Sequence, residues 1–197
     1  MKAKIPILCV GILLFMTVGA KGTLKLDVYE DTVIQPGDEL NIVNTYNDAT
    51  VGMTGGNVID LHTFETSVFN FFNGQIDSLY LSDSSTLYMY GGQIGSAIRL
   101  SGSAKANILG GDIGPEISIH DSAVAIFHGS NFLWEDTGTG RSGFLSGYLV
   151  DDTPFRTYLR GLPEAFPGSH VVLIPEPCTL LMFAIGTLSL SGRRIAR

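Results

Sequence analysis

Cysteine is nearly absent from this chain of 197 residues, which contains only Cys9 and Cys178. Both lie in apolar runs near the two ends, so no cysteine between them is available for a disulfide or a cysteine metal site. We therefore expect the central part of the chain to be held together by side-chain packing and backbone hydrogen bonds alone.

Charged residues are also few, at 16% of the chain, and basic residues are the scarcer kind. Five of the twelve Lys and Arg residues lie at the ends, so residues 21–177 retain seven against all nineteen acidic residues, a net charge of −12. Nucleic-acid binding requires clustered Lys and Arg to face the phosphates. This balance argues against a nucleic-acid partner and suits an extracellular protein.

Glycine, in contrast, is abundant and recurs at an almost fixed interval. Twenty-four glycines are present. The aligned ones are Gly56, Gly74, Gly92, Gly111 and Gly129, with separations of 18, 18, 19 and 18, and Gly37 precedes the first by 19. A fixed period over several units is typical of a solenoid. Glycine is expected at its corners, where the chain turns sharply and often through positive φ.

Apolar residues recur at fixed distances from these glycines. Five positions before them stand Val51, Phe69, Leu87, Ala106 and Val124, and three positions before them stand Met53, Phe71, Met89, Ile108 and Ile126. Side chains two residues apart lie on the same face of a strand. Each unit is therefore predicted to hold two or three short strands, of roughly three to five residues, separated by turns such as Ser82–Ser85.

This pattern predicts an all-β fold, a parallel β-helix of about five or six coils. A single coil cannot bury its apolar face, whereas stacked coils place like residues over like and form a continuous core. An up-and-down antiparallel β-sandwich is the alternative, although it does not require equal spacing of one residue type. We expect Leu24–Val43 to cap one end, and the turn-rich loop Asn131–Gly143 and a following hairpin to cap the other.

The chain begins with a pattern typical of a secretory signal peptide. Two lysines lie within Met1–Lys4, an apolar run covers Ile5–Val18, and the small residue Ala20 follows. We expect export by the secretion machinery and cleavage between Ala20 and Lys21. An uncleaved membrane anchor is the alternative, which the shortness of the run disfavours.

The other end combines a motif, an apolar run and a basic terminus. Pro175, Glu176 and Pro177 are followed by the uncharged stretch Cys178–Gly192, and then by Arg193, Arg194 and Arg197. As a helix, this stretch would span about 22 Å, somewhat less than a hydrocarbon layer of about 30 Å. A buried core segment is therefore the alternative. The arginines instead indicate a tail held in a membrane with its basic end on the cytoplasmic side.

This tail resembles the PEP-CTERM sorting signal of exported bacterial proteins, also known as the C-terminal domain of ice-binding-type proteins. The family usually has Ser after the motif, where this chain has Cys178. The hairpin region Leu145–Leu159 also resembles the segment that precedes such tails, and the repeats resemble those of β-helical members.

The resemblance implies an exported protein that is held transiently in the inner membrane by its tail. An exosortase-type membrane protease would cut it near the motif, and the protein would join the cell surface or the exopolysaccharide matrix. The bodies of family members differ widely, so the resemblance implies a destination and not an activity.

Together these features predict a division of the chain into five segments. They are a signal peptide (1–20), an N-terminal cap with the first coil (21–50), the β-helix repeats (51–133), a cap hairpin (134–174) and the sorting segment (175–197).

Catalytic residues are sought among the acids and histidines, because β-helices include glycan lyases and hydrolases. Such sites need several carboxylates converging on one face. Asp60, Asp77 and Asp112 stand four, three and one positions after their glycines, so they share no column. The histidines also occupy different positions: His62, His120, His128 and His170. We interpret them as solvated turn residues and assign no catalytic residue, metal or cofactor; a glycan-active enzyme is the alternative.

An aromatic stripe is the remaining candidate for binding. Phe72, Tyr90 and Phe127 stand two positions before their glycines, and Tyr88 stands four before. Alternation places both positions on the outer surface, where rings stack on sugars or pack against a partner. We expect a non-enzymatic surface protein whose rings contact exopolysaccharide. Alternatively, the cap covers these rings or the corner turns them inward.

Overall fold

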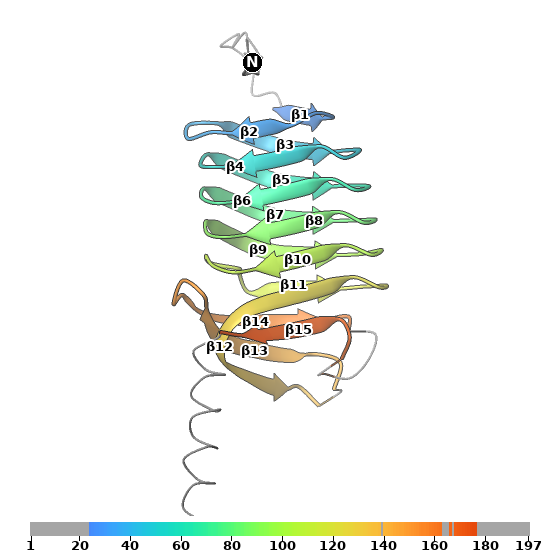
Figure 1. Cartoon of the computed structure of the whole chain (residues 1–197), viewed down its shortest axis with the longest axis vertical. Coiled ribbons are helices and arrows are strands. Elements are labelled where there is room, and N and C mark those ends of the chain that lie inside the picture. Colours follow the sequence, from blue (N-terminus) through green and yellow to red (C-terminus); the bar gives the residue numbers. More distant parts are fainter. Residues whose placement is uncertain (1–23, 139, 163–165, 167, 177–197) are drawn as a thin grey trace, which may run out of the picture.

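The computed structural model describes residues 24–138, 140–162, 166 and 168–176. In this part of the chain every regular element is a β-strand, and the strands stack as parallel coils into a β-solenoid (Figure 1). The predicted signal helix and C-terminal apolar helix lie outside the described residues.

Each coil contributes two strands, one of up to eight residues and one of four in the central coils. The strands are β1 (Lys25–Val28), β2 (Thr32–Ile34), β3 (Glu39–Thr45), β4 (Thr50–Met53), β5 (Asn57–Thr63), β6 (Val68–Phe71), β7 (Gln75–Leu81), β8 (Thr86–Met89), β9 (Gln93–Leu100), β10 (Lys105–Ile108), β11 (Glu116–Ile119), β12 (Val124–Asp136), β13 (Gly143–Leu149), β14 (Pro154–Arg160) and β15 (Val171–Pro175).

The strands form two parallel rows that face each other across the core. The odd-numbered row runs from β1 to β11 and the even-numbered row from β2 to β12, and every neighbouring pair within a row is parallel. This arrangement confirms the predicted parallel solenoid and excludes the antiparallel sandwich. Residues 24–43 contain strands of the first coils, stacked at the end of the rod.

Like residues lie over like in the core, as the columns of the sequence predict. Met53 lies beside Phe71, Phe71 beside Met89, and Met89 beside Ile108 in neighbouring strands, and all four side chains are buried. Dense packing of such columns removes apolar surface from water in every coil, which is the main stabilising force of a solenoid.

Four of the aligned glycines are corner residues with left-handed backbone. Gly56, Gly74, Gly92 and Gly111 have φ angles of 86°, 114°, 81° and 88°. At Gly92 a Cβ atom would lie 2.4 Å from Cζ of Phe71 in the preceding coil, so both the turn and the packing require glycine there.

Gly129 does not belong to this series. The repeats aligned on their glycines place the last coil one residue out of register, so this part of the prediction is wrong. Ala106 pairs with Ala125 and Ile108 with Phe127, so the last coil is one residue longer than the aligned glycines suggest. Gly129 lies within β12, where a Cβ atom would be 1.9 Å from the carbonyl oxygen of Tyr148. It is needed for the close approach of the cap hairpin.

The second corner of each coil is also left-handed, which the sequence analysis did not predict. Its residues are Asn47, Glu65, Asp83, Gly102 and Asp121, with φ between 56° and 67°. Their carboxylates link coils: Glu65 accepts a hydrogen bond from the amide of Asn47 at 2.5 Å, and Asp83 accepts one from the amide of Glu65 at 3.0 Å. The acids therefore stabilise the turns of the preceding coil.

The cap at the far end closes the two rows into one sheet. Strand β12 continues to Asp136 and includes Trp134, so the predicted loop Asn131–Gly143 is a strand over its first half. The predicted hairpin is present as β13 and β14. Strand β13 pairs with both β12 and β14, and β14 pairs with β11, while β15 pairs in parallel with β12 (Figure 1).

Candidate functional site

Three rings form an exposed cluster on the even-numbered row, and we call Phe72, Tyr88 and Tyr90 the ring cluster. Phe72 directly follows β6 and Tyr90 directly follows β8, so they occupy the same place in successive coils. Their ring centroids are 5.1 Å apart with planes at 6°, and the centroid of Tyr88 lies 6.5 Å from that of Tyr90. Exposed fractions of 49%, 36% and 44% agree with the predicted outward positions.

Phe127 is not part of this surface, contrary to the sequence prediction. Because the last coil is one residue longer, Phe127 lies beside Ile108 in the inward column. Its side chain is fully buried, and its ring stacks on Phe155 of β14 with centroids 5.4 Å apart. Phe127 therefore joins the solenoid core to the cap and has no surface for a ligand.

Sequence reasoning missed a second set of stacked rings on the odd-numbered side. Tyr29, Tyr46 and Phe64 follow β1, β3 and β5, and successive ring centroids lie 5.0 and 5.1 Å apart. The signal was present, since Tyr46 and Phe64 are 18 residues apart. Both stand ten residues before an aligned glycine, but the same position in the next two coils is Ser82 and Ser101, so the sequence shows no continuous aromatic column.

A neighbouring outward column places His62, Tyr80 and Arg99 in register on β5, β7 and β9. The rings of His62 and Tyr80 stack with centroids 4.4 Å apart. Arg99 lies over the Tyr80 ring at 5.0 Å and donates a hydrogen bond from Nη1 to its hydroxyl oxygen at 2.8 Å. Partial burial lowers the pKa of His62, while the negative charge of Asp60 acts in the opposite direction.

Stacking determines which ring faces on these surfaces are accessible to a ligand. Face-to-face rings in a column cover one another, so they present mainly edges to solvent, and only a ring at the end of a stack has an uncovered face. Thr54 follows Met53, which pairs with Phe71, so the residue next to Phe72 in the preceding coil is small, and the Phe72 side chain is 49% exposed. Phe72 and Tyr88 therefore provide the best platform for an apolar ligand face.

The candidate catalytic acids interact with neighbouring groups of the solenoid. Asp77 accepts a hydrogen bond from Oγ of Ser96 at 2.7 Å, and Asp112 accepts one from the amide of Gly114 at 3.3 Å. Asp60 acts on His62 through its charge. Within the described residues, no three His, Cys, Asp or Glu side chains are grouped in a way that could hold a metal ion.

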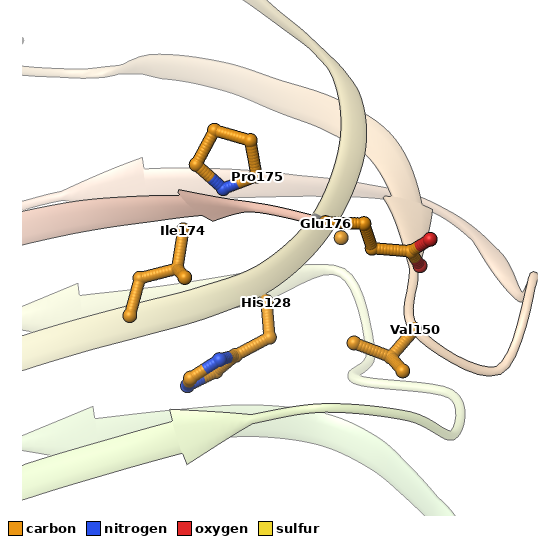
Figure 2. Close-up of a pocket in the computed structure, with 6 residues that line it drawn as sticks. His128, Val150, Ile174, Pro175 and Glu176 are labelled. Atoms are coloured by element: carbon orange, nitrogen blue, oxygen red, sulfur yellow. The ribbon is translucent and has the colours of Figure 1, made fainter. Parts of the chain in front are cut away.

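The Pro-Glu-Pro motif begins inside the folded body. Pro175 ends β15 and pairs with Gly129, whose carbonyl oxygen accepts a hydrogen bond from the amide of Glu176 at 3.0 Å. Both motif residues border a shallow depression of about 250 Å³, whose lining consists of His128, Gly129, Val150, Ile174, Pro175 and Glu176 (Figure 2).

The Glu176 carboxylate points away from the His128 ring in this depression (Figure 2). Burial lowers the pKa of His128. The remaining predicted processing residues, Ala20, Lys21, Pro177, Arg193 and Arg194, lie outside the described residues. Within the described part, no helix is long and apolar enough to span a membrane.

Neither the family models, nor the curated proteins, nor the solved structures contain a match to this chain.

Proposed function

We propose that this is an exported, non-enzymatic protein of the cell surface or exopolysaccharide matrix, sorted by its C-terminal tail. One observation supports the proposal above all: β15, the last strand among the described residues, ends at Pro175, where the Pro-Glu-Pro motif begins. A cut after the motif would remove the apolar run and the arginines and would leave all of the described strands in place. Such a tail can act as a disposable membrane anchor.

The proposed route has three steps. The secretion machinery exports the chain and cleavage occurs between Ala20 and Lys21. The apolar run after Pro177 then holds the protein in the inner membrane, with Arg193 and Arg194 on the cytoplasmic side. An exosortase-type protease cuts near Pro-Glu-Pro and releases the body to the surface.

Mass spectrometry of both termini tests this route on protein recovered from the cell surface. We expect an N-terminus at Lys21 and a C-terminus close to Pro177. Surface protein that retains Arg193 and Arg194 would contradict the proposed processing, and retention of Met1–Ala20 would contradict the proposed signal cleavage.

We further propose that the ring cluster contacts exopolysaccharide. Aromatic rings with one exposed face bind the apolar faces of sugar rings, and nearby amides supply hydrogen bonds. Asn70 and Asn107 lie beside Tyr88 in the neighbouring strands and so are placed for this role.

A retention assay tests the glycan contact with the double variant Phe72→Ser and Tyr88→Ser. We expect the mature variant to bind extracted exopolysaccharide at least about fivefold more weakly than the unaltered protein, because two stacking surfaces are lost. Tyr148→Ser is the matched control, since Tyr148 is equally exposed but lies on the cap. Equal retention by all three proteins would contradict the contact, and shortening of the glycan would contradict the non-enzymatic role.

A further inference from the structure

The first coil has a strand edge that no strand of the described residues covers. Strands β1 and β2 are the two ends of the sheet, and no described residue pairs with the outer side of β1 (Figure 1). Leu24, Tyr29 and Val33 at this end are 47%, 57% and 54% exposed. An unpaired edge flanked by apolar side chains is a template for pairing with another strand.

The backbone amides and carbonyls of β1 alternate between the next coil and the free side of the strand. The carbonyl oxygens of Leu24 and Val28 accept hydrogen bonds from Ile42 and Tyr46 of the next coil. Because peptide groups alternate along a strand, the amides and carbonyls of Lys25 and Asp27 point to the free side. Two residues of β1 are therefore ready to exchange hydrogen bonds with an added strand.

The side chains of β1 select the register of that strand. Lys25 and Asp27 point outward and lie on either side of Leu26, which packs partly against the core. In an antiparallel pair of identical strands centred on Leu26, each Lys25 lies opposite Asp27 of the second copy. Centring on Lys25 or Asp27 would instead set like charges opposite each other, which is destabilising.

We infer that β1 is a docking edge for a second copy of this chain, which forms a head-to-head dimer with two-fold symmetry. The pairing places Lys25 opposite Asp27 twice, Leu26 opposite Leu26, and the exposed Leu24 opposite Val28. Such an interface is self-complementary, as two-fold symmetry requires. The two solenoids then continue as one rod with a shared core.

The chain's own N-terminal residues are too few to occupy the edge once the signal is removed, a step that belongs to the proposed function. Cleavage after Ala20 leaves only Lys21, Gly22 and Thr23 before Leu24. Three residues reach about 10 Å when fully extended and must also reverse direction to lie along β1. A second copy is therefore the better occupant.

Sedimentation of the mature protein tests this interface through charge. We expect the unaltered protein to be a dimer. Lys25→Glu should raise the dissociation constant of the dimer at least about tenfold, and adding Asp27→Lys to this variant should restore dimerisation. Within one chain Nζ of Lys25 also lies 3.2 Å from Oδ1 of Asp27, and Asn44 donates a hydrogen bond to that carboxylate, so both changes act on the fold as well as on the interface. Unfolding midpoints of each variant separate loss of pairing from loss of fold.

A cross-link tests the register. In the inferred pairing the two Leu26 Cα atoms face each other at about 4.5 Å, a distance that a disulfide spans. Leu26→Cys in the mature protein, which lacks Cys9 and Cys178, should give a covalent dimer that a reductant dissolves. Ile42→Cys is the matched control, since Ile42 lies beside Lys25 one coil inward. A monomeric unaltered protein, or cross-linking equal to the control, would overturn the inference, and N-terminal sequencing would show whether uncleaved signal residues are present instead.

Discussion

The imidazole ring of His62 lies flat against the phenol ring of Tyr80, with 4.4 Å between ring centroids and 6° between ring planes. Partial burial in this stack is the main reason why the pKa of His62 is lowered from its ordinary value of 6.5. When the pH falls through that ordinary value, the unfolded chain takes up a proton before the folded one does. The free energy of unfolding therefore decreases as the solution becomes more acidic.

We expect the urea midpoint of the mature protein to fall between about pH 7.5 and pH 5.5. The fall should be shallower in His62→Asn. Part of it should remain, because burial also lowers the pKa of His128, and the double variant with His128→Asn should be shallower still. An unchanged slope in His62→Asn would show that the stack does not keep this imidazole neutral.

Among the glycines of the last coil, Gly129 should be the one at which an added side chain destabilises the protein most. A Cβ atom at this position would lie 1.9 Å from the carbonyl oxygen of Tyr148, so β13 would have to move away from β12. We expect Gly129→Ala to lower the free energy of unfolding by about 3 kcal/mol or more, measured by urea denaturation.

Gly52→Ala is the matched control for this prediction. Its Cβ atom would meet only Val33 Cγ2, at 3.9 Å, which is ordinary van der Waals contact. We expect no loss, or a gain of about 0.5 kcal/mol from reduced freedom of the unfolded chain. Similar losses at both positions would contradict the role assigned to Gly129.

Phe127 and Tyr90 should behave differently when replaced by serine, although both stand two residues before an aligned glycine. Phe127→Ser removes a fully buried ring that stacks on Phe155, and should cost about 3–5 kcal/mol of stability. Tyr90→Ser removes an exposed ring and should cost about 1 kcal/mol or less. Equal losses in chemical denaturation would contradict the one-residue shift of the last coil.

Asp83 should tolerate asparagine but not alanine. Its backbone is left-handed, with φ of 57°, and its carboxylate accepts a hydrogen bond from the amide of Glu65. Asparagine also adopts this conformation and retains an acceptor oxygen, whereas alanine loses both advantages. We expect a loss of about 0.5 kcal/mol or less for Asp83→Asn and about 2 kcal/mol for Asp83→Ala in thermal or urea unfolding. If Asp83→Ala leaves the free energy of unfolding unchanged, the hydrogen bond from this carboxylate to the preceding coil does not stabilise the turn.

The parallel solenoid could be predicted from the sequence because stacking repeats the same environment in every coil. Met53, Phe71, Met89 and Ile108 occupy one inward column at a spacing of 18 or 19 residues, and an antiparallel fold would not require that regularity. The cap hairpin was also predictable, because the Asp151–Pro154 turn interrupts two strand-like stretches.

The candidate surfaces were only partly predictable. Three rings of the predicted stripe are exposed as expected, but Phe127 is not, because an extra residue in one coil reverses the face of every residue that follows it on the strand. The columns of Tyr46 and His62 on the other side follow the same period. The turns of the second corner were predicted, as at Ser82–Ser85, but the left-handed backbone of its acids and the stacking of the rings beside it were not.

By itself the sequence determined which side chains face inward in the central coils, since the period of the repeat and the alternation of a strand leave one consistent arrangement. Only the tertiary structure decided where that arrangement ends. The pairing of β12 with β13 and β15 buries Phe127, requires Gly129 and places Pro175 and Glu176 at the edge of the last coil. These relationships join residues that are distant along the chain and follow no period, so they arise only when the cap packs against the solenoid.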